Sequence, residues 1–184
     1  MSREPFFKTK GNVNVKECNF SDNITDIVVQ FKSHKSTDII ILGLSILRRR
    51  DGQMVALAIS SPDNALILNS GIGRNLSQKR TRPIHSSVNL LFSDPRIRFA
   101  GFYFHRLAIQ LKACLAIDLQ GFDIVHNYNG NESYTSPGEV VSQKLSSKDF
   151  RFFEINRLWD EVIDRPSRKN SLNNLVDRAW VTGK

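Results

Sequence analysis

The residues of this chain whose type and spacing could do chemistry are cationic. They form four short clusters: Arg48, Arg49 and Arg50; residues 79–82; residues 96–98; and residues 165–169. Closely spaced guanidinium and ammonium groups neutralise phosphates, which gives salt-dependent binding without reading of base sequence. The whole chain has 26 Lys and Arg against 18 Asp and Glu, a formal net charge of +8. This balance favours a polyanionic partner, with ordinary solvated loop charges as the alternative for any one cluster.

Residue types that hold transition metals or form disulfide frameworks give no pattern. Cys18 and Cys114 have neither C-x-x-C nor zinc spacing, so we expect two reduced thiols in the core of an intracellular protein. The four histidines are scattered along the chain without the spacing of metal ligands. The sequence therefore predicts no cofactor.

Length and composition indicate one globular domain. The 184 residues are 40% hydrophobic and 24% charged, which is enough apolar material for a core. We expect an N-terminal segment at residues 1–20 and a single domain at residues 21–184. The longest apolar run, residues 39–47, is about half the ~20 residues of a membrane helix, and the N-terminus lacks the apolar core of a secretory signal. We therefore expect a nuclear or cytoplasmic protein without a membrane partner.

Apolar spacing predicts which elements position these residues. Three helical faces follow the 3.6-residue period, the first capped by Ser21 or Asn23 and the last closed by Gly121: Ile24, Ile27, Val28 and Phe31; Ile84, Val88 and Leu91; Leu107, Leu111, Cys114 and Leu115. Strands are predicted at residues 13–16, at 39–47 with both faces buried, at 54–59 and 65–68 as a hairpin, and at 98–104. Further on we expect a long polar loop at 126–148, a strand-to-helix segment at 152–163 and a helix at 171–180. This order predicts an α/β domain with a mixed sheet and helices on both faces.

This order and three stretches of sequence resemble the ribonuclease-H-like (DnaQ-like, DEDD-type) 3′–5′ exonuclease superfamily, in particular plant proteins similar to the Werner-syndrome exonuclease domain. Residues 41–48, Ile-Leu-Gly-Leu-Ser-Ile-Leu-Arg, stand where that family has hydrophobic-x-Gly-Leu-Asp-x-Glu-Trp. Residues 91–101, Leu-Phe-Ser-Asp-Pro-Arg-Ile-Arg-Phe-Ala-Gly, resemble its Phe-Leu-Ser-Asp-Pro-x-Ile-x-Phe-Val-Gly, and residues 171–176 resemble its Ser-Leu-x-x-Leu helix. The resemblance covers residues 24–181 and implies the family's exonuclease fold without its last helix.

The resemblance also shows what the chain lacks. The family holds two Mg²⁺ or Mn²⁺ ions with four carboxylates, and these ions activate water and stabilise charge on the phosphate. The first-motif Asp and Glu fall on Ser45 and Leu47, and the second-motif Asp falls on Leu107, or on Arg106 or His105 with a slip of one or two residues. The last acidic motif has no counterpart. We therefore expect no catalytic residue and no metal site, with Leu47 and Leu107 filling the place of the site with apolar atoms.

Three functions stay open. The first is a catalytically inactive exonuclease-like protein that binds nucleic acid without sequence preference, or regulates active relatives. Its candidate binding residues are Arg48, Arg49, Arg50, His105 and Arg106. The second is an active metal-dependent 3′–5′ exonuclease with substitute ligands, for which the nearby acids are Asp38, Asp51, Asp94, Asp118 and Asp123. The third is an interaction protein, a homo-oligomer or a partner of related subunits, without a nucleic-acid role.

Polyanion binding gives the first prediction. Replacing Arg48, Arg49 and Arg50 together with Ala should lower the slope of log K against log salt by up to three phosphate contacts, at ~0.7 to 0.9 each. The slope is measured with a labelled oligonucleotide over a series of salt concentrations, and circular dichroism shows whether the variant is folded. An unchanged slope in a folded variant would remove these three residues from the binding surface.

Overall fold

The computed structural model describes residues 13–33, 39–49, 51–70, 83–124, 136–145, 162–163 and 175–179. A short helix at residues 175–179 follows the last strand. The elements before it, in chain order, are β1 (Asn14–Asn19), α1 (Thr25–Ser33), β2 (Ile40–Arg49), β3 (Met54–Ser60), β4 (Asn64–Asn69), α2 (Ser86–Ser93), β5 (Ile97–Gly101), α3 (Phe104–Leu115), β6 (Gly121–Asp123), α5 (Pro137–Leu145) and β7 (Val162–Ile163).

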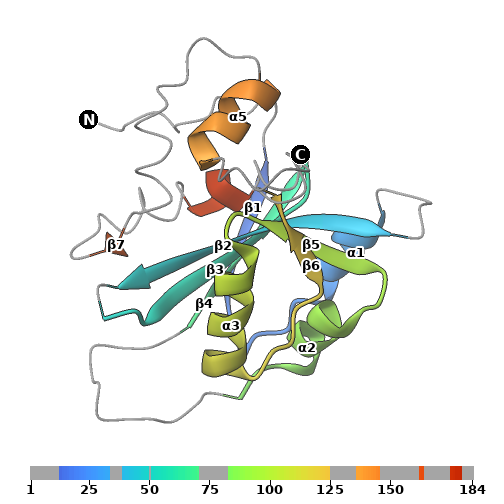
Figure 1. The fold of residues 1–184 in the computed structure, drawn as a ribbon. Helices are drawn as coiled ribbons and strands as arrows, with labels where there is room; N and C mark the ends of the chain where they lie inside the picture. Colours follow the sequence, from blue (N-terminus) through green and yellow to red (C-terminus); the bar gives the residue numbers. More distant parts are fainter. Residues whose placement is uncertain are drawn as a thin grey trace, which may run out of the picture.

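The strands form one mixed sheet in the order β1-β4-β3-β2-β5-β6, as Figure 1 shows, and β7 pairs with the end of β2. The three strands β2, β3 and β4 are antiparallel, whereas β5 is parallel to β2, β6 to β5 and β1 to β4. The predicted hairpin and the predicted mixed α/β sheet are confirmed. The sheet begins at Asn14, inside the segment that we expected to precede the domain.

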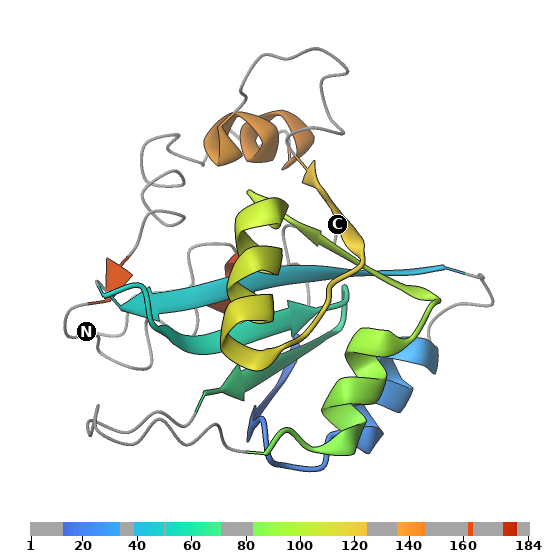
Figure 2. The ribbon, with the colours of Figure 1, turned by 60° about the horizontal axis from the view of Figure 1, so that its bottom comes forward.

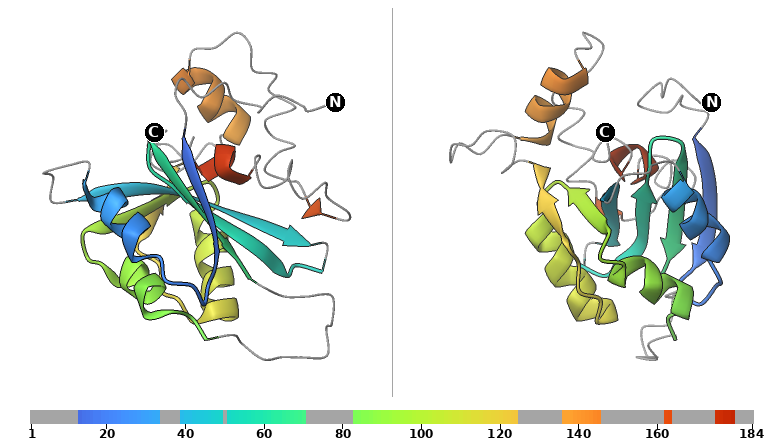
Figure 3. Two further views of the ribbon diagram at one scale, coloured as in Figure 1. Left: turned by 180° about the vertical axis from the view of Figure 1, so that it is seen from behind. Right: turned by 90° about the vertical axis from the view of Figure 1, so that its right-hand side faces the viewer.

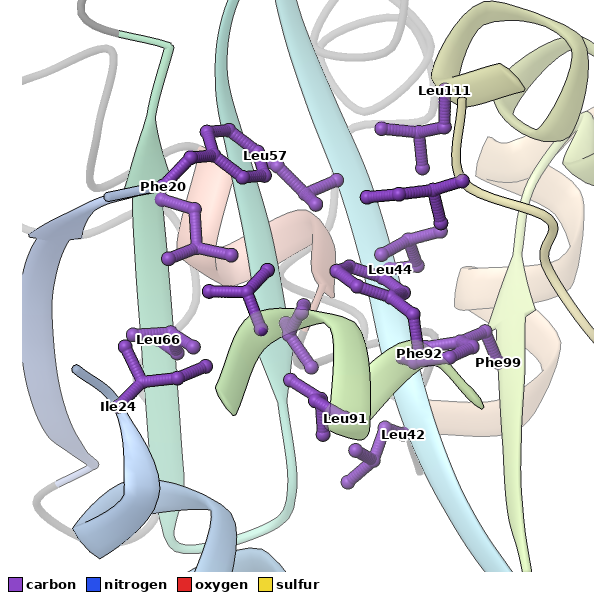
Figure 4. Close-up of a cluster of buried hydrophobic side chains, with 14 of the residues drawn as sticks. Phe20, Ile24, Leu42, Leu44, Leu57, Leu66, Leu91, Phe92, Phe99 and Leu111 are labelled. Carbon is purple, nitrogen blue, oxygen red and sulfur yellow. The ribbon is translucent and has the colours of Figure 1, made fainter. Parts of the chain in front are cut away.

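Alternation along the strands builds a core on each side of this sheet. On the side that we call face A, the side chains of Leu42, Leu44 and Ile46 pack under helices α1, α2 and α3 in the larger cluster shown in Figure 4. On face B, Leu47 packs with small residues of β3 and β4 and with the helix at 175–179. Helices therefore lie on both faces, which Figures 2 and 3 show from other directions.

Two strand predictions need correction. The start of the strand predicted at 39–47 is not buried on both faces, because Ile39, just before β2, and Ile41 are 55% and 46% exposed. The aromatic strand ends at Gly101 instead of running to residue 104, because Tyr103 adopts the left-handed conformation (φ 55°) and α3 begins at once. Consecutive aromatic residues have a high strand propensity, but tertiary packing decides where the strand ends.

Three predictions further along the chain are also wrong. The interval 126–148 is not only a polar loop, since α5 lies within it and buries Val140 and Val141. Gly121 does not close α3, which ends with Ala116 in the left-handed conformation; it lies in β6, where a Cβ would stand 2.0 Å from the Phe99 carbonyl oxygen. Cys114 is exposed and only Cys18 is a core thiol.

The helices of the described residues are all too short or too polar to cross a membrane. The strand-to-helix prediction for 152–163 falls outside the described residues except for β7. The helix predicted at 171–180 is described, and is helical, over residues 175–179. This helix covers face B over the second half of β2.

An ion-pair cluster fastens α1 to the segment after α2. The Asp94 carboxylate accepts hydrogen bonds from Arg96 (3.3 Å) and lies 2.6 Å from the Lys32 ammonium, and its side chain is only 9% exposed. Arg96 and then Lys32 hold the pKa of Asp94 well below its usual range. The folded protein therefore favours the ionised form of the Asp94 carboxylate.

Removing this charge should weaken the fold in a pH-dependent way. We expect Asp94→Asn to lower the free energy of unfolding by about 2 kcal/mol at pH 7, because hydrogen bonds to charged groups are lost. The folded pKa lies below the unfolded value of about 3.9, so this stabilisation is complete above that value and is lost as the pH falls. Urea unfolding measures the difference in free energy of unfolding between the variant and the parent, which should be smaller at pH 3 than at pH 7. The same difference at both pH values would contradict stabilisation by the charge of Asp94.

Candidate functional site

The centre of the candidate site is a stretch of β2 that has a strand neighbour on one side only. On its β5 side, the last paired residue of β2 is Gly43, opposite Ala100, and pairing resumes at Arg48, opposite Val162 of β7. On the other side of β2, β3 pairs with residues 43–48, which include this whole stretch. We call residues 44–47 the β2 notch; among the described residues, no strand pairs with it on the β5 side. Both first-motif positions, Ser45 and Leu47, lie in it.

Helix α3 approaches the notch where β5 ends. A Cβ on Gly101 would lie 2.8 Å from Leu107 Cδ1 and 3.4 Å from the carbonyl oxygen of Leu44. Glycine at this position therefore lets the first turn of α3 pack directly against β5 and the notch. Leu107, one of the three predicted second-motif positions, packs against the face A cluster.

The two leucines do not fill one space, which corrects the expectation from the sequence. Leu47 is 2% exposed and packs on face B, whereas Leu107 is half-buried against the face A cluster. The reason is strand alternation, which sends Ser45 and Leu47 to the side of the sheet opposite Leu44. Ser45 is buried as well, at 5%.

A buried guanidinium group lies at the notch. Arg178, in the helix at 175–179, is 2% exposed, and its Nη2 donates a hydrogen bond to the carbonyl oxygen of Ile46 at 3.3 Å. The helix reaches the sheet because its Leu175, Val176 and Ala179 pack with Leu47 over small side chains of β3 and β4. Sequence reasoning missed Arg178; the available signal was an Asp-Arg pair inside the apolar pattern of residues 175–179.

Asp123, one of the candidate acids, lies at the end of β6 in a structural role that sequence reasoning missed. Its side chain is 9% exposed, its Oδ2 accepts a hydrogen bond from the Phe104 backbone N–H at 2.8 Å, and His105 Nδ1 lies 3.7 Å from the same oxygen. Tyr103 gives α3 no side-chain cap, so this carboxylate satisfies the helix N-terminus and its positive dipole instead. Asp123 pairs with Gly101, two strands from β2, which places its backbone about 10 Å from the notch.

The remaining candidate acids do not converge on the notch. Asp51 accepts from the Gln53 backbone in the β2–β3 turn, Asp94 is held by Lys32 and Arg96, and Asp118 pairs with Lys112. Asp38 falls outside the described residues. Within the described ranges, no group of three or more His, Cys, Asp or Glu side chains could hold a metal ion.

The predicted cationic residues lie in the first turn of α3 and at the end of β2. His105 and Arg106 are exposed in its first turn, where the Arg106 guanidinium lies 5.4 Å from the centre of the Tyr103 ring. One turn further, Gln110 Nε2 donates to the Gly52 carbonyl at 2.9 Å, so α3 runs toward the turn that follows Arg48 and Arg49. Arg48 is exposed, and Arg49 is half-buried with a hydrogen bond to Gln53. Arg50 falls outside the described residues.

Charge is divided unevenly along the chain. The described residues contain ten Lys or Arg and ten Asp or Glu, so they are formally neutral. The other 16 of the 26 basic residues and the other 8 of the 18 acidic residues fall outside them. The net charge of +8 therefore belongs entirely to the segments outside the described ranges.

No protein-family model matches the sequence, and no curated protein sequence matches it significantly. The fold, however, is known. The structure matches RNase D of Escherichia coli, an exoribonuclease involved in structured RNA processing, with a TM-score of 0.64 and 9% identity over 92% of this chain. A nuclease in its apo form matches with a TM-score of 0.56 and 10% identity, over 92% of this chain and 77% of that chain. This chain spans 42% of the length of RNase D.

These matches establish the fold: the chain has the mixed α/β architecture of ribonuclease-H-like exonuclease domains, as the resemblance in its sequence implied. At 9% and 10% identity the likeness concerns the fold alone. What a site on this fold can do depends on its own residues.

The role of Asp123 gives a prediction for this region. Asp123→Ala should lower the free energy of unfolding by about 1 kcal/mol, because α3 loses the acceptor at its N-terminus. Asp118→Ala is the matched control, since that side chain is 80% exposed beyond the other end of the helix. Urea unfolding of both variants measures the difference. Equal losses would show that Asp123 does not cap α3.

Proposed function

We propose that this chain is an exonuclease-like protein without metal-dependent catalysis that binds nucleic acid, or acts on active relatives, through contacts needing no metal ion. One observation carries the proposal: the two positions aligned with the first acidic motif hold a hydroxyl and a buried leucine, and a buried guanidinium is hydrogen-bonded to the carbonyl oxygen of Ile46 between them in the sequence. The fold accounts for the exonuclease likeness, and the side chains account for the proposed loss of catalysis.

The residues present do not fit a pair of divalent ions. Mg²⁺ and Mn²⁺ require several ionised oxygen ligands in fixed geometry, and Ser45, Leu47 and Leu107 offer one hydroxyl among the three side chains. Arg178 adds a fixed positive charge that is 2% exposed and hydrogen-bonded to the Ile46 carbonyl. The same helix carries one buried carboxylate, Asp177, which is 5% exposed and directly precedes Arg178. One carboxylate beside a guanidinium is too few ionised oxygen ligands for two divalent ions.

Nucleic-acid binding is supported by charge and by accessible side chains. Arg48 and Arg106 are exposed, and Arg106 stacks on Tyr103, an arrangement that can also receive a base. The net charge of +8 favours a phosphate backbone as the partner. Since the described part of the chain is formally neutral, we propose that residues outside it supply most of the attraction, without base-sequence preference.

The proposal is tested on the full chain with 3′-extended single-stranded RNA and DNA carrying a 5′ fluorescein. We expect binding that weakens steeply with salt, is equal in Mg²⁺, Mn²⁺ and EDTA, and leaves the strand at full length. Metal-dependent shortening from the 3′ end would overturn the proposed loss of catalysis. Absence of binding at low salt would overturn the nucleic-acid role, and light scattering would then test assembly with itself.

Restoring the first acidic motif should not restore an exonuclease. We expect the double variant Ser45→Asp/Leu47→Glu to show no metal-dependent cleavage, because the other carboxylates are still missing and Arg178 remains. Leu47→Glu should also lower the free energy of unfolding by about 3 kcal/mol, since it places a carboxylate in an apolar cluster.

Leu47→Met is the control, because it keeps volume and apolarity and should cost less than about 1.5 kcal/mol. Cleavage that needs Mg²⁺ or Mn²⁺ in the double variant would show that further ligands lie near the notch. Equal stability of the Glu and Met variants would show that Leu47 is not packed as described.

A further inference from the structure

On face A, away from the notch, an open groove of about 480 Å³ runs between α1 and α2. Figure 2 shows these two helices side by side. The floor is formed by Val28, which is nearly buried, and the rims carry Val29 on α1 and Leu90 on α2, which are 58% and 64% exposed. Large apolar side chains exposed on both rims of one groove are a feature of protein interaction sites.

The groove is held open by contacts at both ends. At one end the backbone N–H of Ile24, the residue before α1, donates to Ser87 Oγ of α2 at 3.0 Å in a buried hydrogen bond. At the other end Lys32 of α1 pairs with Asp94, which follows α2. A groove whose walls are fixed in this way needs little rearrangement to bind a partner, which lowers the entropic cost of binding.

The charged end of the groove is cationic toward solvent. Lys32 and Arg96 share the one carboxylate of Asp94, so this end keeps a surplus of one positive charge. The carboxylate is 9% exposed while the Arg96 side chain is 57% exposed, so an incoming group meets the cations first. An acidic side chain would be attracted here and a basic one repelled.

We propose that this groove binds an amphipathic helix of a partner protein, with an apolar stripe lying between Val29 and Leu90 and an acidic residue reaching Lys32 and Arg96. Both walls are helices, of nine and eight residues, and they present no open backbone edge that an extended peptide could pair with. A helix satisfies its own backbone hydrogen bonds and buries residues at i, i+3, i+4 and i+7 in such a groove. A single surplus charge among apolar rims does not suit nucleic acid.

The test titrates the full chain into fluorescein-labelled 18-residue synthetic peptides and follows anisotropy. One peptide has leucines at i, i+3, i+4 and i+7 with glutamates at both ends; a second has lysines in place of the glutamates; a third has the first composition in scrambled order. We expect the Glu-flanked peptide to bind at least tenfold more tightly than the other two. Similar affinity for all three would overturn the proposal, as would no binding of the first.

Surface variants locate the site. Leu90→Asp should weaken binding of the Glu-flanked peptide at least tenfold, and Arg96→Glu should reverse the preference between the Glu-flanked and Lys-flanked peptides. Ile109→Asp on α3 is the matched control, because Ile109 is 68% exposed and does not line the groove. Equal losses for the Leu90 and Ile109 variants would overturn the proposed location. Thermal melting checks folding, and Leu90→Gln replaces Leu90→Asp if the latter unfolds.

A second copy of the chain is the competing occupant. If light scattering shows self-association that Leu90→Asp abolishes, the groove is an interface between copies and the partner-helix proposal is overturned. Oligonucleotide binding by Leu90→Asp should equal that of the parent, because the groove and the notch are separate. The helix-binding proposal and the nucleic-acid proposal can therefore fail independently, and this measurement shows which of them has failed.

Discussion

The constraint on which the rest of this structure depends is the burial of residues 42–47 of β2 on both faces, with no described strand paired to residues 44–47 on the β5 side. From Leu42 to Leu47 every residue of the strand is buried, so neighbours must cover both sides of the sheet. Face A is closed by α1, α2 and α3, and face B by the helix at 175–179. On the β5 side of the notch no described strand supplies hydrogen-bond donors, and buried carbonyls need them. Arg178 supplies one of them at Ile46.

This arrangement explains how a fold of nucleases can be stable with leucine and serine at the positions that match the acidic motif. Several carboxylates close together repel one another and are tolerable only with bound cations. Here the apolar Leu47 joins a packed cluster with the small side chains of β3 and β4, and the guanidinium of Arg178 remains as a permanent cation bonded to the backbone. A guanidinium offers donors in a plane and no open coordination position, so it can satisfy carbonyl oxygens but cannot activate water as a metal ion does.

Much of the fold follows from local sequence patterns, and the parts that do not follow have a common physical origin. The hairpin of β3 and β4 and the helices α1 and α2 carry strong period and turn signals, and they were predicted in place. The three-residue strand β6 has too few residues for a periodic signal, and α5 lies in a polar segment with a short apolar face. Asp123 and Arg178 act on residues 19 and 132 positions away, so their roles depend on topology that composition and spacing do not encode.

The division of charge gives the surfaces of this protein different physical characters. The described domain is formally neutral, and its charged side chains are largely engaged in local pairs such as Lys32 with Asp94 and Lys112 with Asp118. Attraction of a polyanion must therefore come mainly from residues outside the described ranges, whereas the groove between α1 and α2 has apolar rims and one surplus charge. Long-range electrostatic attraction weakens as salt is added, whereas the free energy gained by burying apolar side chains is not screened by salt. The proposed nucleic-acid contact and the proposed helix contact therefore use different residues, and their affinities should respond differently to ionic strength.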